Sequence, residues 1–334
     1  MKTVKIGIIG FGYWGPNLAR NFFALDGCQV KYIVDLSPAR LAAAKKLYPS
    51  VNTTDKLETV LDDAEIDAVV IASPVSTHFQ FAQKALVKGK HVLVEKPMTR
   101  LVSEAEELIA LAKKQGRVLM VDHTFLYTGA VKKIKEMIKS DQLGKIQYFD
   151  STRINLGLFQ HDINVIGDLA PHDLSILSYL VDEAPASVIA TGVSHTDNKV
   201  ENLAYLTLNY QSAMIAHFTL SWSSPVKIRK TLIAGTKKMV VYDDLEPTEK
   251  VRVYDTGFKA SESQNLLIDY RVGDIYIPKI EQTEALSALA KDFLAAITTG
   301  KAPLADAQKG LAVVRILESA EKSLKNHGQE VKLS

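Results

Sequence analysis

The chain of 334 residues is long enough for two domains, and its 47% apolar and 23% charged residues are typical of a folded protein with a hydrophobic core. Forty basic residues against 38 acidic ones give a net charge of +2 without a block of like charge, which argues against a nucleic-acid or membrane surface. The single cysteine, Cys28, excludes an intrachain disulfide, and no cysteine or histidine spacing predicts a bound metal. We therefore expect a cytoplasmic protein with a small, well-hydrated partner.

Residues 1–122 alternate between apolar runs and segments of helical period. Runs that are apolar on both faces and separated by helices indicate a parallel sheet covered on both sides, which predicts a doubly wound Rossmann domain of α/β class. We expect Ser37 to cap one helix ahead of Pro38, and Ser103 with Glu106 to form a capping box at another. The predicted strands are Val4 to Ile9, Val30 to Val34, Ala68 to Ala72, His91 to Val94 and Val118 to Val121, and the predicted helices are Asn17 to Ala24, Pro38 to Tyr48, Phe79 to Val87 and Val102 to Gln115.

Residues 123–334 change to longer, alternating strands, which predict a second α/β domain with a large, open, mainly antiparallel sheet. One face of such a sheet is free for a ligand or a second subunit. The uncharged run from Asn202 to Val226 could span a bilayer, but polar residues interrupt it, so we interpret it as a hairpin turning at Gln211 and Ser212. The predicted strands are Ile146 to Ile154, Ser187 to His195, Leu203 to Tyr210, Ala213 to Trp222, Ile228 to Ala234, Lys238 to Tyr242 and Lys250 to Tyr254, and the predicted helices are Ala130 to Leu143, Pro171 to Val181, Thr283 to Ile297 and Ala305 to Leu324.

A glycine-rich turn follows the first strand. Its pattern Gly-x-Gly-x-x-Gly lies between a strand and a helix, and the next strand ends in Asp35, twenty residues later. The glycines allow a tight turn, close approach to a pyrophosphate and close helix packing, while the helix amides face the phosphates. This setting predicts a dinucleotide site, although a glycine-rich turn without a ligand is the alternative. The residues of the turn are Gly10, Phe11, Gly12, Tyr13, Trp14 and Gly15.

Asp35 distinguishes between the two nicotinamide cofactors. Its carboxylate would accept hydrogen bonds from the ribose hydroxyls and repel a 2′-phosphate, which favours NAD over NADP. Arg40, five residues later, could hold that phosphate or stack on adenine, although a solvated arginine in a first helical turn is more common. We therefore predict NAD, and NADP stays possible.

Polar residues follow two other strands at the sheet edge where ligands bind in open α/β sheets. Ser73, Pro74 and His78 could line a nicotinamide pocket, and Glu95 and Lys96 follow the next strand directly. Lys96 could donate to a substrate hydroxyl and stabilise an alkoxide. A surface salt bridge between Glu95 and Lys96 is the alternative.

Asp168 and His172 are four residues apart near a predicted helix start that contains Pro171. This spacing directs both side chains to one side, and a helix N-terminus favours an anion and lowers the pKa of a histidine. A neutral imidazole beside a carboxylate suits a general base acting on a secondary alcohol. From the residues alone, a helix cap by Asp168 with a half-buried His172 is the preferred alternative.

Further polar residues could contact a substrate. His123 and Tyr127 follow the last strand of the first domain, and a polar cluster that could grip sugar hydroxyls or a phosphate precedes Asp168. A solvated loop is the alternative for this cluster. Its members are Arg153, Asn155, Gln160, His161 and Asn164.

In this order, the glycine-rich turn, Asp35, the Ser73 to His78 segment, the Glu95-Lys96-Pro97 box and the Asp168 to His172 pair resemble the glucose-fructose oxidoreductase, inositol dehydrogenase and MocA family of sugar oxidoreductases. The resemblance covers essentially the whole chain. It implies a Rossmann domain, a C-terminal domain whose open sheet commonly forms a dimer interface, and hydride transfer between a nicotinamide and a sugar or cyclitol carbinol.

The resemblance also implies roles for three catalytic residues. His172 falls on the position of the general base, Asp168 on the residue that orients it and the substrate, and Lys96 on the active-site lysine that polarises the reacting oxygen. Two positions depart from the family pattern. Ala170 replaces a glycine common within the Asp-x-x-x-His pair, and Leu126 and Tyr127 stand where an arginine often follows His123, which affects how the substrate is placed.

The strings around Gly12 and Asp168 are similar to those of members associated with nucleotide-sugar pathways. We therefore expect an NAD(P)-dependent dehydrogenase acting on a ring CH–OH group, most often C3, of a nucleotide sugar. An inositol or free-sugar dehydrogenase is the alternative within the family, and a non-catalytic NAD-binding regulator is the alternative of another class. We also expect a homodimer or homotetramer formed through the C-terminal sheet.

Overall fold

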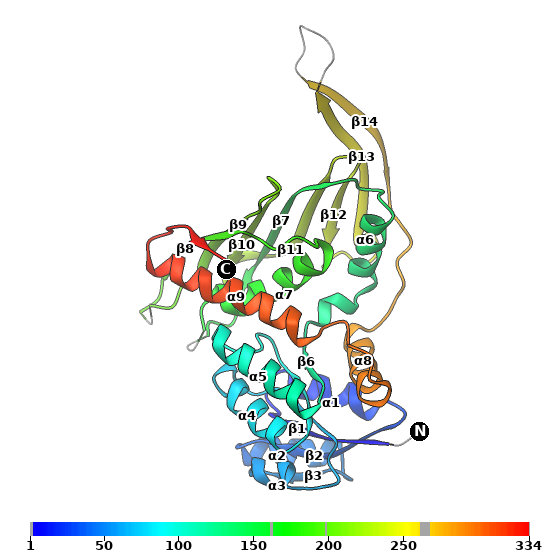
Figure 1. Ribbon diagram of the computed structural model, residues 1–334, viewed down its shortest axis with the longest axis vertical. Coiled ribbons are helices and arrows are strands. Elements are labelled where there is room, and N and C mark those ends of the chain that lie inside the picture. Colours follow the sequence, from blue (N-terminus) through cyan, green and yellow to red (C-terminus); the bar gives the residue numbers. More distant parts are fainter. Residues whose placement is uncertain (1–2, 161–162, 198, 261–267, 334) are drawn as a thin grey trace. The chain divides into compact units, whose positions relative to one another are not determined.

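The computed structural model describes residues 3–160, 163–197, 199–260 and 268–333, and the chain folds into two compact units (Figure 1). Unit 1 contains residues 1–127 and 283–315, and unit 2 contains residues 128–282 and 316–334. The first crossing lies five residues beyond the expected boundary at 122. The segment 283–315, expected in the second domain, returns to unit 1, so the chain crosses between the units twice more than the sequence predicted.

Unit 1 contains a six-stranded parallel sheet. Its strands are β1 (Val4–Ile9), β2 (Cys28–Val34), β3 (Asn52–Thr54), β4 (Ala68–Ile71), β5 (His91–Val94) and β6 (Leu119–Val121). Their order in the sheet is β3-β2-β1-β4-β5-β6, the order of a dinucleotide-binding Rossmann fold. β4 is buried along its whole length, as expected of a central strand covered by helices on both faces. The predicted doubly wound fold is confirmed, while the short β3 was not predicted.

Local signals define several helix ends in unit 1. The Ser37 hydroxyl accepts from the Arg40 amide at 3.4 Å, which confirms the predicted cap. The capping box predicted at Ser103 is wrong, because the N-cap residue is Leu101, two positions earlier, and the Glu104 carboxylate accepts from the Leu101 amide at 3.3 Å. The helices of unit 1 between the strands are α1 (Gly15–Phe23), α2 (Pro38–Leu47), α3 (Leu57–Leu61), α4 (Val75–Val87) and α5 (Val102–Gln115), with a 3-10 turn at η1 (Thr124–Tyr127).

The returning segment carries α8 (Ala285–Thr299) and the start of α9 (Ala307–Lys325). Within unit 1, Phe293 of α8 packs its ring edge-on against Phe22, with ring centroids 6.3 Å apart. The Tyr127 hydroxyl donates to Asp292 at 2.7 Å. The sequence predicts the helical period of this segment, but its partners are distant in sequence and no local pattern identifies them.

Unit 2 contains a nine-stranded sheet. Its strands are β7 (Ile146–Leu156), β8 (Ser187–Val193), β9 (Leu203–Asn209), β10 (Ile215–Ser221), β11 (Ser223–Gly235), β12 (Met239–Asp243), β13 (Val251–Ala260), β14 (Ile268–Tyr276) and β15 (Val331–Lys332). The order is β14-β13-β12-β11-β7-β10-β9-β8-β15, and every pairing is antiparallel except that between β7 and β10. The predicted mainly antiparallel sheet and the β9–β10 hairpin are confirmed. β14 was not predicted.

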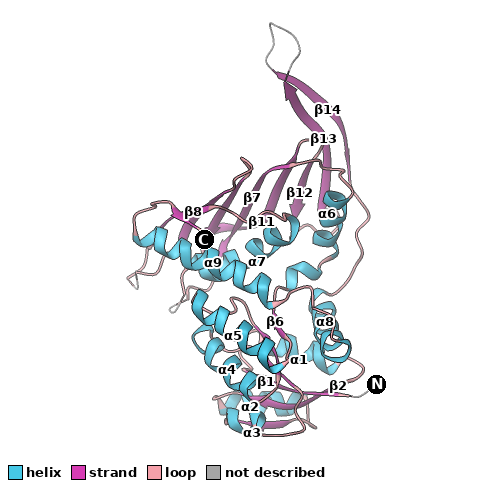
Figure 2. Cartoon of the chain, viewed as in Figure 1, coloured by secondary structure: helices cyan, strands magenta, loops and turns pink. Residues whose placement is uncertain are grey.

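One face of this sheet is covered by helices α6 (Gly129–Lys139) and α7 (Val165–Leu180), with α7 against β7, β9 and β10 (Figure 2). Side chains on that face, such as Phe149 and Phe218, are buried and pack together with ring centroids 5.8 Å apart. The residues between them in each strand point to the other face. That open face carries large exposed apolar side chains, namely Tyr148, Tyr205, Ile215 and Leu232.

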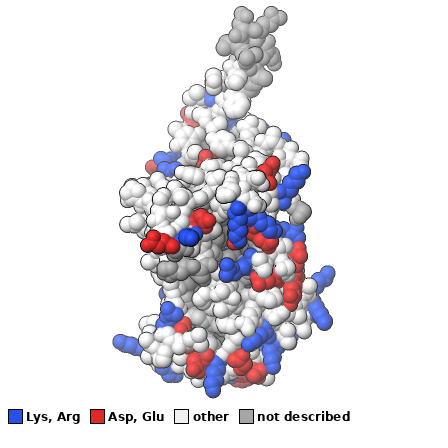
Figure 3. Space-filling model, turned by 90° about the vertical axis from the view of Figure 1, so that its left-hand side faces the viewer, with Lys and Arg blue, Asp and Glu red and all other residues white. Residues whose placement is uncertain are grey.

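Charged side chains of both signs are interspersed on the visible surface (Figure 3), as the net charge of +2 leads one to expect. Within the part of the chain that the structure describes, no helix combines the length and the apolar character that a membrane crossing requires.

Candidate active site

The glycine-rich turn connects β1 to α1 in unit 1. Gly10 has a φ of +96°, and a Cβ there would lie 2.6 Å from the Ala72 carbonyl oxygen. A Cβ on Gly15 would lie 2.2 Å from the Gly10 carbonyl oxygen, so neither position accepts a side chain. A Cβ on Gly12 would meet only the Arg40 guanidinium, at 3.6 Å. The turn is therefore closely packed at Gly10 and Gly15 and accessible beside Gly12, as a pyrophosphate-binding turn requires.

Asp35 connects the glycine-rich turn to the end of β2. One carboxylate oxygen accepts from the Phe11 amide at 2.7 Å, and the other accepts from the Ser37 amide at 2.9 Å. The Arg40 guanidinium lies 3.6 Å from the first oxygen. A carboxylate offers about four acceptor positions, so Asp35 retains capacity for ribose hydroxyls. The same corner thus holds a carboxylate that suits NAD and an exposed arginine that could accommodate a 2′-phosphate.

His78 ties together the loops that follow β4 and β5. It is buried on α4, with Nε2 lying 2.9 Å from the Ser73 carbonyl oxygen and Nδ1 lying 2.9 Å from the Pro97 carbonyl oxygen. Burial lowers the pKa of His78. The ring therefore supports the backbone at Ser73 and at Pro97, whose peptide bond with Lys96 is cis. These contacts suit a positioning role, and the expected direct contact of His78 with the cofactor stays a prediction.

A pair of carboxyl groups lies at the ends of β5 and β6. Glu95 accepts from the Lys96 amide at 3.2 Å, and Asp122 accepts from the Trp14 indole at 3.1 Å. Burial, and then the negative charge of Asp122 and a hydrogen bond to it, hold the pKa of Glu95 well above its usual range. Trp14 belongs to the glycine-rich turn, so the pair links that turn to Lys96. Sequence reasoning missed Asp122, although it directly follows a strand at the same sheet edge as Glu95.

Replacing Glu95 with glutamine is expected to stabilise the cofactor-free protein at alkaline pH. The amide can keep both the donor and the acceptor role of a protonated carboxyl. Because the pKa of Glu95 is raised by folding, its unfolded form releases the proton first, and stability falls as pH rises from the unfolded pKa through the folded one. Each pKa unit between the two states corresponds to about 1.4 kcal/mol.

Thermal unfolding from pH 4 to pH 9 measures this effect. We expect Glu95→Gln to match the parent protein near pH 4 and to unfold at a higher temperature near pH 9. Glu107→Gln, at an exposed position of α5, is the control that should show no pH-dependent gain. A Glu95→Gln protein whose unfolding temperature at pH 9 equals that of the parent would contradict the raised pKa of Glu95.

Two residues expected to contact substrate lie inside unit 1. The Tyr127 hydroxyl accepts from the Ala305 amide at 3.2 Å and donates to Asp292, so it supports the fold where a substrate contact was expected. His123 is buried, and neither of its ring nitrogens has a hydrogen-bond partner among the described residues. Burial, and then the positive charge of Lys96, lowers the pKa of His123 to about 3. Buried polar atoms normally have a partner, so ligand binding by His123 stays a prediction.

In unit 2, α7 carries Asp168 and His172. The helix begins at Val165, six residues before the expected start, because Asn164 caps it by accepting from the Gly167 amide at 3.0 Å. Asn164 is thus a helix cap where a substrate contact was expected. Asp168 lies in the first turn and accepts from the Trp222 indole at 3.2 Å. His172 lies two turns in, beyond the first turn to which the electrostatic effect of a helix N-terminus is limited.

Arg153 of β7 forms a buried ion pair with Asp173 of α7. Nε lies 2.8 Å from one carboxylate oxygen and Nη2 lies 2.7 Å from the other, and the two residues are 4% and 2% exposed. This geometry engages two guanidinium nitrogens inside unit 2, and the expected contact between Arg153 and the substrate stays a prediction. Asn155 lies half-buried on the same strand, Gln160 is also half-buried, and His161 lies outside the described residues.

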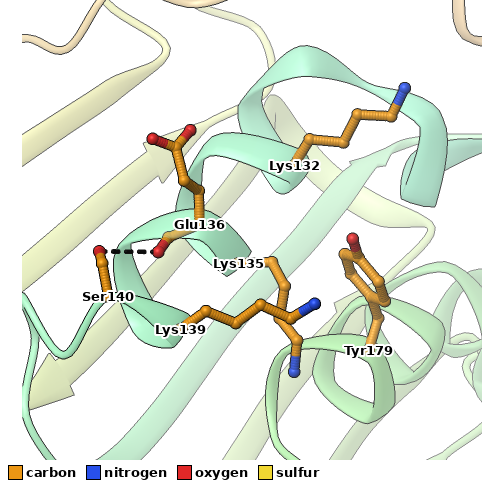
Figure 4. A pocket seen from close by; sticks show the side chains of 6 residues that line it. All are labelled: Lys132, Lys135, Glu136, Lys139, Ser140 and Tyr179. Atoms are coloured by element: carbon orange, nitrogen blue, oxygen red, sulfur yellow. Dashed lines mark hydrogen bonds between the residues drawn. The ribbon is translucent and has the colours of Figure 1, made fainter.

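A pocket of about 430 Å³ in unit 2 lies next to none of these residues (Figure 4). Lysines of α6 and Tyr179 of α7 line it, and the buried Lys135 donates to Asp182 at 2.8 Å and to the Leu180 carbonyl at 3.2 Å. Because Lys135 already has these partners, the pocket offers no clear chemical function. None of the predicted site residues is among those that line it. Its lining residues are Lys132, Lys135, Glu136, Lys139, Ser140 and Tyr179.

The strand order, the glycine cradle and the acidic residue ending β2 define a dinucleotide-binding oxidoreductase fold. Comparison with known protein families agrees. Residues 4–123 match the model described as "Oxidoreductase family, NAD-binding Rossmann fold", and residues 131–241 match the GFO/IDH/MocA C-terminal domain.

Similar proteins cover the chain almost completely. UDP-N-acetylglucosamine 3-dehydrogenase of Acidithiobacillus ferrooxidans is 30% identical over 96% of both chains. Its solved structure, 26% identical by structural alignment, covers 98% of this chain and 99% of its own with a TM-score of 0.82. The scyllo-inositol 2-dehydrogenase (NADP(+)) IolW of Bacillus subtilis is 23% identical over 97% of this chain and 95% of its own.

The chain belongs to the GFO/IDH/MocA oxidoreductase family, as its sequence pattern predicted. It is therefore an NAD-binding oxidoreductase, and the expected activity of a dehydrogenase on CH–OH groups agrees with the names of its relatives. The predicted cofactor, NAD, is confirmed at the level of the family, and NADP is named for one relative.

Proposed function

We propose that this protein is an NAD-dependent dehydrogenase that oxidises or reduces a ring carbinol of a nucleotide sugar, at C3. The observation that carries the proposal is the match along 96% of both chains to UDP-N-acetylglucosamine 3-dehydrogenase. An inositol dehydrogenase is the second candidate, supported by the similarity to scyllo-inositol 2-dehydrogenase.

The proposal assigns the chemistry to Lys96 of unit 1 and to Asp168 and His172 of unit 2. His172 takes the hydroxyl proton during oxidation, and Lys96 donates a hydrogen bond to the reacting oxygen, where negative charge develops. The bound nicotinamide supplies the hydride acceptor or donor. Asp168 orients the imidazole and the substrate, and the Trp222 indole, 3.2 Å from its carboxylate, fixes the carboxylate in turn.

Residues of unit 1 hold the cofactor in this proposal. The glycine-rich turn from Gly10 to Gly15, with its side chains Phe11, Tyr13 and Trp14, borders the pyrophosphate, and Asp35 and Arg40 meet the adenosine ribose. Ser73 and Pro74 line the nicotinamide side, where His78 and Glu95 support the backbone around them. For the substrate, His123 and Asn155 stay candidates, since Tyr127, Arg153 and Asn164 have structural partners of their own.

Turnover with a substrate panel tests the proposal. The purified protein is incubated with NAD or NADP and with UDP-sugars, free hexoses and inositols, while the absorbance of the reduced cofactor is followed. We expect UDP-N-acetylhexosamines with NAD to give the highest kcat/KM. Turnover of inositols alone would favour the second candidate, and no turnover of any compound in either direction would refute a dehydrogenase of this substrate class.

We further propose that copies of the chain associate through the open face of the nine-stranded sheet, as a homodimer or homotetramer. The exposed apolar side chains of that face, including Tyr148, Tyr205 and Leu232, support this contact. The cytoplasm is the proposed location, because the single Cys28 is a free thiol and NAD is an intracellular cofactor.

A further inference from the structure

β13 and β14 continue beyond the rest of the nine-stranded sheet as a two-stranded ribbon (Figure 1). β12 pairs with β13 only from Val251 to Tyr254, whereas β14 pairs with β13 as far as Ala260. We call residues 255–260 and 268–272 the arm. Within the described residues no third strand pairs with the arm, and a two-stranded ribbon is at best marginally stable alone in water. Further contacts are needed to hold it.

The arm has one apolar face and one charged face. Phe258 pairs with Tyr270, and Thr256 pairs with Val272, so these four side chains share a face. Phe258 is 51% exposed, Tyr270 80% and Val272 85%. Arg271 lies on the other face, where it donates to Asp255 at 3.0 Å and also to the Lys237 carbonyl. The charged face thus has partners inside unit 2, while large side chains of the apolar face stay in solvent.

The apolar face of the arm continues the open face of the sheet. Val253 points to the buried, helix-covered face, so Tyr254, Thr256 and Phe258 alternate to the opposite one. The register shift beyond Tyr254 places one extra residue in β14, which leaves the alternation of β13 unchanged. Through the paired strands, Tyr254 shares its face with Tyr148 of β7. A continuous apolar surface therefore extends from the sheet onto the arm.

We propose that the arm docks onto a second copy of this chain, with its apolar face against the open sheet face of the partner. This inference rests on the proposed assembly through that sheet face. A two-fold axis pairs the same surface of both copies, so each copy would contribute one arm and receive one. Continuity of the two apolar surfaces favours this occupant, because a single contact then covers both. Exposed aromatic side chains such as Phe258 and Tyr270 are of the kind that anchors interfaces.

Sedimentation equilibrium of three variants tests the arm separately from the sheet. Val272→Glu alters the arm, Leu232→Glu alters the open sheet face, and Val87→Glu alters an equally apolar, exposed position of α4 as control. We expect the arm and sheet variants each to raise the subunit dissociation constant at least about 30-fold, the effect of losing one hot spot, and the control to leave it unchanged. Circular dichroism confirms that each variant folds.

The results of these experiments either support or refute the arm contact. Dissociation by both Val272→Glu and Leu232→Glu supports the arm proposal. Dissociation by Leu232→Glu alone refutes the arm and keeps the sheet contact, and a parent protein that is monomeric at all concentrations refutes both. If Val272→Glu does not fold, a photo-crosslinker at position 272 in otherwise unchanged protein decides. Cross-links to Tyr148 or Leu232 of a second, isotope-labelled copy support the arm, and their absence overturns it.

Discussion

Replacing His172 with asparagine is expected to lower kcat at least about 100-fold while the dissociation constant for NAD changes little. General-base catalysis by a positioned side chain contributes about 100-fold to 10,000-fold, and asparagine cannot take the proton of a carbinol. The groups proposed to bind the dinucleotide, from Gly10 to Gly15 and Asp35, all belong to unit 1, whereas His172 belongs to unit 2. Binding of the cofactor should therefore survive the substitution.

Steady-state kinetics and cofactor titration measure the two effects separately. His327→Asn, at an exposed position, is the matched control and should retain full activity. Lys96→Met should likewise reduce kcat and keep NAD binding. Full activity of His172→Asn would remove the histidine from the proposed mechanism.

The sequence predicts unit 1 well because its signals are local. Strands such as β1 and β5 consist mostly of apolar residues, and their predicted bounds agree with the structure. The strand β3 has only three residues, Asn52–Thr54, without a buried side chain, so no hydrophobic pattern marks it. The Glu95–Asp122 pair escaped detection for another reason: its members are 27 residues apart and meet only because parallel strands end at one sheet edge.

The start of α7 shows where a local rule leads to a wrong boundary. Proline favours the first turn of a helix, which is why the sequence predicts a start at Pro171. The structure places Pro171 inside the helix, at the loss of its hydrogen bond to the carbonyl four residues earlier, because Asn164 supplies a better cap. The Asp168 to His172 pair shares one helix only with the observed start, because a helix that began at Pro171 would leave Asp168 outside it. His172, expected in the first turn, lies two turns in.

Arg153 shows that a residue type can be right for two opposite roles. An arginine near a candidate site fits a phosphate, and the sequence offers nothing to exclude that. Asp173, which engages it bidentately, lies 20 residues away on another element. The structural role predicts a loss of stability on substitution, whereas a phosphate-binding role predicts a raised KM in a normally stable protein. The two roles can therefore be separated by experiment.

Replacing Arg153 with methionine is expected to destabilise unit 2 by about 3–5 kcal/mol, the effect of leaving one charge of a buried pair without its partner. The Asp173 carboxylate is 2% exposed and would have to stay buried or take up a proton. The double variant Arg153→Met with Asp173→Leu should recover most of this loss, because replacing a whole buried pair by apolar side chains is often neutral.

Denaturant unfolding of the single and double variants, followed by a double-mutant cycle, measures the coupling. Lys237→Met removes an exposed ion pair with Asp141 in the same unit and should change the free energy of unfolding by less than about 1 kcal/mol. Titration of Arg153→Met and Arg153→Lys with UDP measures ligand binding independently of stability. An Arg153→Met protein of normal stability that binds UDP more weakly than the parent would contradict the structural role. That result would mean that the Arg153 guanidinium binds the pyrophosphate and not Asp173.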